Sequence, residues 1–273
     1  MTSSLTITGI QTELQWEDIP ANLEELGKKV LTMPQYTEVV VLPEMFSTGF
    51  SMQPARLAEN MQGRTMQWMK KISAQKKVIL TGSLIIEEQD QAGKKHYYNR
   101  LVWMQPDGQY GFYDKRHRFA YAGEDKEFTA GNKRLIASVK GWKINLQVCY
   151  DLRFPVWARQ QSQEEAPEYD VLIYVANWPE RRVNAWKTLL QARAIENQCY
   201  VVGINRVGHD GHNNYHTGES MVVGPLGEII HQAKSEEEIF TVTLDRTQLE
   251  EVRAKLPFWK DGDSFQLLQE DPS

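Results

Sequence analysis

The amino-acid sequence predicts an α/β protein in which sheets and helices form layers. Short apolar runs rich in β-branched residues alternate with longer amphipathic stretches, and Gly, Pro, Asn or Asp bounds most of the short runs. This alternation favours layered sheets and helices over a helical bundle or an all-β sandwich. No internal repeat and no Pro/Ser-rich linker interrupts the pattern, so we expect a single domain over residues 1–273.

About nine segments are predicted to be strands, because each is short, apolar and rich in Val, Ile, Thr or aromatic residues. In chain order they are 5–11, 38–43, 78–88, 97–105, 143–150, 170–176, 200–207, 219–225 and 238–244. Two turn sequences, QPDG at 105–108 and GPLG at 224–227, each lie between strand runs. We expect both to close hairpins.

Five amphipathic stretches are predicted to be helices, at residues 20–33, 63–76, 153–163, 183–198 and 245–255. In the fourth, apolar residues recur at three- and four-residue spacing, so one helix face is expected to be buried. These residues are Ala185, Leu189, Ala192 and Ile195.

Composition excludes several classes of protein. The formal net charge of -5 argues against a nucleic-acid binder, which is usually basic. The N-terminal residues lack the pattern of a secretory signal, and no apolar run is long enough to span a bilayer. The two cysteines form no disulfide framework. We therefore expect a cytoplasmic protein that binds neither nucleic acid nor membrane.

A thiol is the candidate nucleophile that the chain offers most clearly. The six histidines show no zinc-site spacing, and the sequence contains no Gly-rich phosphate loop and no GxSxG elbow. Cys149 lies at the end of the apolar run 143–150, where a strand leads into a predicted helix N-terminus that would lower the pKa of the thiol. The alternative is that Cys149 is an inert buried residue, as free cysteines usually are.

Glu44 and Lys115 are the other candidates. Glu44 follows the apolar strand 38–43 and would lie at the same rim as Cys149 if the two strands are parallel neighbours. Lys115 follows a strand and hairpin rich in aromatic residues. Each also fits a simpler role, Glu44 as a surface or ion-paired carboxylate and Lys115 as a solvated cation.

Three strings of the sequence resemble the catalytic blocks of the nitrilase, or carbon–nitrogen hydrolase, superfamily: LPEMFSTGF at 42–50, YDKRHRF at 113–119 and CYDLRFPVW at 149–157. In that superfamily the blocks contain Glu, Lys and Cys in this order. Here 71 residues separate Glu44 from Lys115, and 34 separate Lys115 from Cys149. Further strings fit the same resemblance: ANWP at 176–179, QARAIENQCYVVGINRVG at 191–208 and ESMVVGPLGEI at 219–229.

The resemblance covers about residues 4–255, which leaves 256–273 as a C-terminal tail. It implies a four-layer α-β-β-α sandwich, in which two sheets face each other and helices cover them outside. It also implies a homodimer formed through the helices near 153–163 and 183–198. Neither a metal nor an organic cofactor is implied, since the protein itself supplies the thiol, the base and the oxyanion donors.

The resemblance also implies roles for individual residues in hydrolysis through a thioester. Cys149 would be the nucleophile and Glu44 the general base, while Lys115 and the backbone N–H of Tyr150 would stabilise the oxyanion. The superfamily has a second glutamate seven residues before a glycine, which is Glu124 here. Glu127, in the same loop, is the competing assignment.

Within the superfamily, the strings CYDLRFP, NWPERR and DGHNNYHTGES most resemble bacterial omega-amidases, which hydrolyse 2-oxoglutaramate and 2-oxosuccinamate. The likeness implies a small 2-oxo acid omega-amide as substrate, and a place in recycling such amides that includes methionine salvage. Arg153 would bind the substrate carboxylate, and Trp178 and Phe46 would form the pocket walls. The alternative for Arg153 is a structural ion pair with Asp151 or another acidic residue.

Other readings remain open at this point. An aliphatic amidase, a carbamoyl-amide hydrolase or a nitrilase would share Glu44, Lys115 and Cys149 and differ in pocket residues. A binding or scaffold protein that has lost catalysis could keep the same fold. Such a protein would be expected to lose one of the three residues, all of which are present here.

Overall fold

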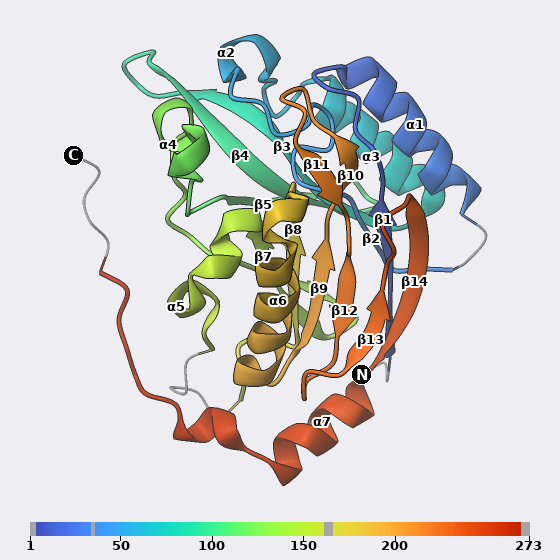
Figure 1. Ribbon diagram of the computed structural model, residues 1–273, viewed down its shortest axis with the longest axis vertical. Helices are drawn as coiled ribbons and strands as arrows, with labels where there is room; N and C mark the ends of the chain where they lie inside the picture. Colours follow the sequence, from blue (N-terminus) through green and yellow to red (C-terminus); the bar gives the residue numbers. More distant parts are fainter. Residues whose placement is uncertain (1–3, 34–35, 161–165, 269–273) are drawn as a thin grey trace.

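The structure is a computed structural model that describes residues 4–33, 36–160 and 166–268 (Figure 1). Two six-stranded sheets form its centre. The first has the order β14 (Glu238–Asp245), β1 (Ser4–Gln11), β2 (Val39–Val41), β3 (Ile79–Gln89), β4 (Lys95–Met104) and β5 (Tyr110–Asp114). The second has the order β13 (Ile229–Gln232), β12 (Met221–Val223), β9 (Tyr200–Ile204), β8 (Val171–Val175), β7 (Trp142–Val148) and β6 (Leu135–Val139).

Alternation along the strands explains why the sheets stack. In β8, Val171, Ile173 and Val175 belong to a core that both sheets share, whereas Leu172 and Tyr174 point to the opposite face and join a core beneath a helix. Successive side chains of a strand point to opposite faces, so an apolar strand must be covered on both. The uninterrupted apolar runs of the sequence are therefore strands buried between two layers.

Helices supply the outer layers. The helices α1 (Ile19–Thr32) and α3 (Arg64–Lys76) pack on the first sheet, and α6 (Val183–Asn197) packs on the second (Figure 1). The architecture is thus the α-β-β-α sandwich expected from the sequence. The remaining helices are α2 (Pro54–Leu57), α4 (Glu124–Glu127), α5 (Pro155–Ala158) and α7 (Arg246–Lys255), with 3₁₀ helices at Ala120–Ala122, Cys149–Arg153, Glu180–Arg182 and Phe258–Asp261. No helix in the described parts of the chain is long and apolar enough to cross a membrane.

Parallel pairing brings loops from both sheets to one end of the sandwich. The strands β1, β2 and β3 are mutually parallel, as are β7, β8 and β9. The carboxyl ends of parallel strands share one edge, where α/β proteins gather their functional loops. The two edges meet, because the N–H of Asn177, after β8, donates to the carboxylate of Glu44, after β2, at 2.9 Å. A two-stranded hairpin of β10 (Val207–His209) and β11 (Tyr215–Thr217) lies near the same end.

Most predicted elements are confirmed. All nine predicted strands are present, both predicted turns close antiparallel hairpins, and four of the five predicted helices match α1, α3, α6 and α7. Five strands are not among the nine predicted ones, namely β5, β6, β10, β11 and β13. Each has only three to five residues and is partly exposed, and β5 and β13 follow the two predicted turns.

The predicted helix 153–163 is wrong. Within its described part, residues 153–160, the segment contains α5 and the last residue of a 3₁₀ helix, and Arg159 has extended backbone angles (φ -62°, ψ 128°). The N–H of Gln160 donates to the side chain of Asn197 at 3.0 Å, which draws the chain out of the helix. Residues 161–163 lie outside the described residues.

The predicted buried face of α6 is confirmed only in part, because Ala185 and Leu189 pack against the core beneath the helix, whereas Ile195 is exposed. The fully buried side chains of α6 are Trp186, Leu190, Arg193, Ala194 and Asn197. Both stripes contain apolar residues at helical spacing, so periodicity alone could not choose between them. Gly203 of β9 makes room for Trp186 and Leu190 to face the sheet, since a side chain at this position would collide with both.

Candidate functional site

Glu44 lies in a sharp turn directly after β2 and is completely buried. Met45 adopts a left-handed φ of 44°, and its N–H donates to the Ser83 hydroxyl of β3 at 2.9 Å. A bulky residue in this region of φ is strained, so the surrounding contacts must hold the turn. The turn directs the Glu44 carboxylate into the space between the two sheet edges, and not to the surface or a solvated ion pair.

Lys115 lies at the end of β5 and is also buried, with its ammonium between two carboxylates. Its Nζ donates to Glu44 Oε1 at 2.9 Å and to Glu124 Oε1 and Oε2 at 3.0 and 2.9 Å. Burial alone would lower the pKa of Lys115, but the charges of Glu124 and Glu44 outweigh it and raise the pKa. Lys115 therefore stays an ammonium.

The structure separates the two competing glutamates. Glu124 is fully buried at the start of α4, and its pKa is raised by burial and by Glu44 against the lowering effect of Lys115. Glu127, at the other end of α4, is exposed. The spacing to Gly131 has a physical basis, because a Cβ at Gly131 would lie 2.0 Å from the Asp114 carbonyl oxygen. Glycine there lets the loop that holds Glu124 close on the end of β5.

Cys149 begins the 3₁₀ helix after β7, with a left-handed φ of 44°. Its side chain is half-buried and reaches the pocket described below. Burial raises the pKa of the thiol well above its ordinary value, and the charges of Glu44 and Glu124 add to this, while Lys115 opposes it. The expected lowering by a helix N-terminus is therefore wrong, because two nearby carboxylates and desolvation dominate.

The predicted reason for the proximity of Glu44 and Cys149 also needs correction. The two residues follow β2 and β7, which belong to different sheets and are not neighbours in one sheet. They meet because the stacked sheets present their carboxyl edges at the same end of the sandwich. Sheet stacking, and not strand pairing, assembles the group.

Asp151, two residues after Cys149, forms hydrogen bonds with residues on both sides of Lys115. It is completely buried, and its carboxylate accepts hydrogen bonds from the Tyr113 hydroxyl at 2.7 Å, the Val148 N–H at 3.0 Å and the His117 N–H at 3.0 Å. Both carboxylate oxygens of Asp151 therefore accept hydrogen bonds from residues around the site. The alternative ion pair between Asp151 and Arg153 is not formed.

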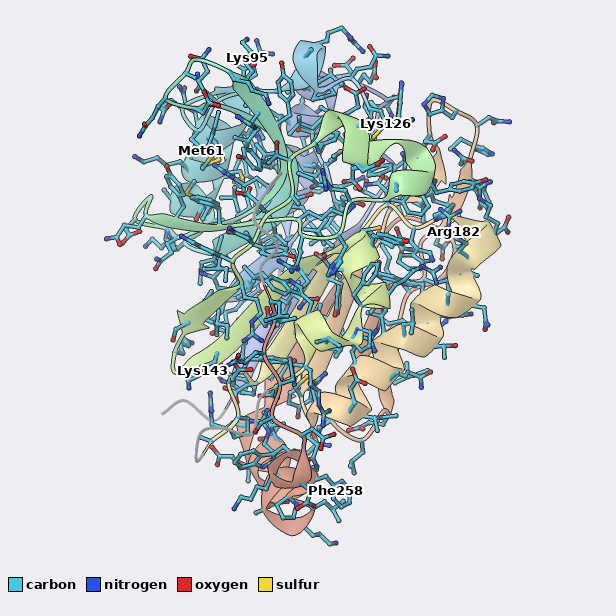
Figure 2. All side chains as sticks on the ribbon, turned by 90° about the vertical axis from the view of Figure 1, so that its left-hand side faces the viewer. Met61, Lys95, Lys126, Lys143, Arg182 and Phe258 are labelled. Carbon is cyan, nitrogen blue, oxygen red and sulfur yellow. The ribbon has the colours of Figure 1, made fainter. Side chains whose placement is uncertain are left out.

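A pocket of about 150 Å³ opens above Cys149. Arg153 and Trp178, which the sequence predicted to bind the substrate, line it. Tyr150 lines it as well, although the prediction assigned that residue only a backbone N–H. The guanidinium carbon of Arg153 lies 4.9 Å from the ring centroid of Trp178. Arg182 lines the same pocket and lies at the N-terminal end of α6, the end nearest the helix that contains Lys126 (Figure 2).

Phe46 does not form a wall of the pocket, so its predicted role is wrong. It is completely buried in the core beneath α1 and α3, where Gly82 of β3 leaves room for its ring. The turn at Glu44 sends consecutive side chains in different directions, which sequence proximity could not show. Phe50, four residues later, lines the pocket instead.

Sequence reasoning missed two asparagines. The Asn99 amide, buried on β4, donates to Glu44 at 2.8 Å and to Glu124 at 3.2 Å. Asn177 contacts Glu44 through its backbone N–H and donates its side-chain amide to the Glu44 carbonyl. Asn99 lies within an apolar strand, where an amide side chain is unusual, and this was the available signal.

Comparisons with known proteins agree with this geometry. The model of the carbon-nitrogen hydrolase family matches residues 6–254. The omega-amidase YafV of Escherichia coli (strain K12) is 42% identical over 96% of this chain and 98% of its own. A 2-oxoglutaramate amidase of Bacillus subtilis (strain 168) is 30% identical over 94% of this chain and 96% of its own.

A crystal structure provides the corresponding likeness in three dimensions. XC1258 from Xanthomonas campestris, a CN-hydrolase superfamily protein solved with an arsenic adduct in its active site, superposes with a TM-score of 0.93. It is 39% identical, and the alignment covers 97% of this chain and 100% of that one.

Proposed function

The chain belongs to the carbon-nitrogen hydrolase family, and we propose from this that it is an omega-amidase that hydrolyses 2-oxoglutaramate and 2-oxosuccinamate. The products are ammonia and the corresponding 2-oxo dicarboxylic acid. The observation that supports the proposal most directly is the buried contact of Lys115 with Glu44 and Glu124 beside Cys149, at the floor of a pocket lined with arginine. The names of the relatives support the substrate class.

In the proposed first half-reaction, Glu44 accepts the thiol proton of Cys149 as the sulfur attacks the amide carbon. A C–S bond forms, and the carbonyl electron pair moves onto oxygen. Lys115 and the backbone N–H of Tyr150 stabilise this oxyanion. The tetrahedral intermediate collapses with cleavage of the C–N bond, and Glu44 returns its proton to the departing nitrogen, which leaves as ammonia.

In the second half-reaction, Glu44 takes a proton from water, and the oxygen attacks the thioester carbon. The C–S bond breaks, and the proton passes to the sulfur of Cys149. Glu124 holds the Lys115 ammonium throughout, so we assign it a positioning role. Arg153 binds the carboxylate at the far end of the substrate, and Trp178 shields the pocket from water.

The raised thiol pKa supports a coupled proton transfer over a preformed thiolate. A thiol that titrates well above its ordinary value is protonated at neutral pH, so the free enzyme stores no ion pair between Cys149 and Lys115. A hydrogen bond from the thiol to Glu44 contributes to the raised pKa, and the same contact provides the path for the proton.

The test is ammonia release from 2-oxoglutaramate by the wild-type protein, Cys149→Ala and Cys199→Ala. Cys199 is a buried thiol remote from the pocket and serves as the matched control. We expect release by the wild type and by Cys199→Ala, and none by Cys149→Ala. If the wild type releases no ammonia from this amide but hydrolyses N-carbamoyl-β-alanine or a simple nitrile, the substrate assignment is wrong and another branch of the family applies.

We also propose that the protein is a homodimer formed through the outer face of α6 and the adjacent α5. Ile195 on α6 and Val156 on α5 are 53% and 50% exposed, which is high for aliphatic side chains. Ala192 lies one turn before Ile195 on α6 and is only half-buried. Such a surface is suited to packing against a second copy of the same helix.

A cytoplasmic location and a role in recycling 2-oxo amides, including methionine salvage, complete the proposal. The support for the location is chemical, since Cys149 and Cys199 are both free thiols and thiols are kept reduced in the cytoplasm. The support for the recycling role is the substrate class of the relatives named above.

A further inference from the structure

Three guanidinium groups line the pocket above Cys149, those of Arg153, Arg181 and Arg182. Within the described ranges 4–33, 36–160 and 166–268, none of the three forms an ion pair with a carboxylate. Other arginines of this chain do so, for example Arg100 with Asp114 at 2.6 Å. Unpaired cations gathered in a cleft indicate a site for an anion.

The acidic residue on the pocket wall is already engaged. Asp210 accepts hydrogen bonds from the N–H groups of His212 and Asn214 at 2.9 and 2.8 Å, and from the Asn214 side chain at 2.9 Å. These bonds form the turn between β10 and β11. Among the described residues, the three arginines of the pocket therefore have no ion-pair partner on its wall.

Aromatic rings hold two of the arginines in place. The guanidinium carbon of Arg153 lies 4.9 Å from the ring centroid of Trp178, and that of Arg182 lies 5.0 Å from the ring centroid of Phe119. The indole N–H of Trp178 also donates to the Arg182 carbonyl at 2.8 Å, which links the two positions. A guanidinium that stacks on a ring keeps its N–H edge available for a carboxylate.

The other charged groups of the pocket are close enough to Arg182 to change its pKa. Burial lowers its pKa, and the neighbouring charges of Arg181 and Arg153 lower it further, whereas the thiol group of Cys149 opposes this. Mutual repulsion of this kind is relieved when an anion binds between the cations. Arg182 thus lies within electrostatic reach of both Arg153 and the reacting sulfur.

We propose that Arg182 and Arg153 together form a clamp for the carboxylate at the far end of the substrate, so that Arg182 determines specificity for amides whose acyl chain ends in an anion. This rests on the proposed omega-amidase function and adds a second binding residue to it. One guanidinium can donate two parallel N–H groups to the two carboxylate oxygens, and a second guanidinium can donate to the lone pairs that remain on those oxygens. Arg181, which is exposed, lies outside the clamp and adds only long-range attraction.

The first test compares 2-oxoglutaramate with its methyl ester, which removes the negative charge and keeps the amide. In Arg182→Gln we expect KM for the acid to rise about 10- to 100-fold, the loss typical of one charged hydrogen-bonded contact. We expect kcat/KM for the ester to stay within about twofold of wild type. Arg182→Lys keeps the positive charge but loses the paired N–H groups of the guanidinium. Its KM for the acid should therefore lie between those of the wild type and Arg182→Gln.

Arg64→Gln is the matched control, because it makes the same chemical change at an exposed position of α3 remote from the pocket. It should leave both substrates unaffected, and a near-ultraviolet circular dichroism spectrum should show that Arg182→Gln is folded. The proposal is overturned if folded Arg182→Gln keeps the wild-type preference for the acid over the ester.

A second test needs no turnover and so separates this proposal from the proposed function. Calorimetry measures the binding of 2-oxoglutarate and of its dimethyl ester to Cys149→Ala and to Cys149→Ala/Arg182→Gln. We expect the diacid to bind Cys149→Ala more tightly than the ester, and the second substitution to weaken diacid binding about 10- to 100-fold. Equal binding of diacid and ester would overturn the clamp, whereas absence of hydrolysis by the wild type would overturn only the proposed function.

Discussion

The ammonium nitrogen of Lys115 lies 2.9 Å from a carboxylate oxygen of Glu44, and both side chains are almost fully buried. Glu124 contacts the same nitrogen at 2.9 Å, so two carboxylates share one cation. This arrangement has an excess of negative charge next to Cys149, which contributes to the raised pKa of the thiol. One buried cluster thus determines both the stability of the site and the protonation of its nucleophile.

Removing the cation should unbalance this cluster. We expect Lys115→Gln to lower the free energy of unfolding by about 3–5 kcal/mol, because two carboxylates would remain buried without their partner. The loss should be smaller at pH 5 than at pH 8, since a buried carboxyl group can then take up a proton. Urea unfolding at both pH values measures this. Lys95→Gln, which breaks an exposed pair with Glu87, is the control and should change little, whereas equal effects of the two variants would contradict the role of the cluster.

The two glutamates of α4 should differ sharply. Glu124→Gln leaves the Lys115 ammonium without one of its two carboxylates, and small misplacements in an active site cost about 10²-fold in rate. We therefore expect kcat to fall by about this factor with little change in KM. Glu127→Gln alters an exposed side chain of the same helix and should leave steady-state kinetics unchanged. If kcat falls in Glu127→Gln and not in Glu124→Gln, Glu127 is the glutamate that positions Lys115.

The thiol of Cys149 should react slowly with iodoacetamide at neutral pH and faster as the pH rises. Burial and the charge of Glu44 both raise its pKa, so Glu44→Gln should shift the alkylation profile to lower pH by removing one of these causes. Mass spectrometry of the modified peptides measures the rates, and buried Cys199 provides an internal control that should stay unmodified in the folded protein. A profile that does not move, or that moves to higher pH, would contradict this electrostatic account.

His216 should contribute to acid sensitivity. Burial, followed by the charge of Arg206, lowers its pKa from 6.5 to about 4. The unfolded chain therefore binds a proton at higher pH than the folded one, so this contribution to stability is present above pH 6.5 and is lost as the pH falls towards 4. The wild type should lose at most about 3 kcal/mol over this window through His216.

Unfolding free energies of wild type and His216→Gln at pH 7 and pH 4.5 test this. The variant should lose less stability between the two pH values, whereas His209→Gln, which changes an exposed imidazole of the same hairpin, should behave as wild type. An equal loss in wild type and His216→Gln would show that other groups cause the acid sensitivity.

The outer face of α6 should govern self-association. Ile195→Glu places a charge at the most exposed aliphatic side chain of the proposed α6 interface, and we expect it to convert the dimer to a monomer. Light scattering coupled to size-exclusion chromatography measures the mass. Leu268→Glu, at an exposed side chain of the C-terminal tail, is the control and should leave the mass unchanged. A wild-type protein that is monomeric at micromolar concentration would contradict the proposal.

Local sequence patterns predicted the elements well, because the forces that form them are local. An apolar run such as 170–176 must be a strand covered on both faces, and a turn such as 105–108 closes a hairpin through its own Pro, Asp and Gly. The helix 153–163 failed for the opposite reason. The path of this segment depends on Asn197, which is distant in the sequence and whose side chain accepts a hydrogen bond from the backbone N–H of Gln160.

The sequence by itself identified Glu44, Lys115 and Cys149 as the residues of interest and left Glu124 and Glu127 as alternatives for a fourth, since the order and spacing of the motifs are readable along the chain. Only the tertiary structure determined which side chains surround these residues and how their pKa values shift. It buried Phe46 in the core, brought Asn99 and Asn177 onto Glu44, and raised the pKa of a thiol that local reasoning expected to be lowered. Desolvation and contacts between stacked sheets act over distances in space, and no local pattern in the chain specifies them.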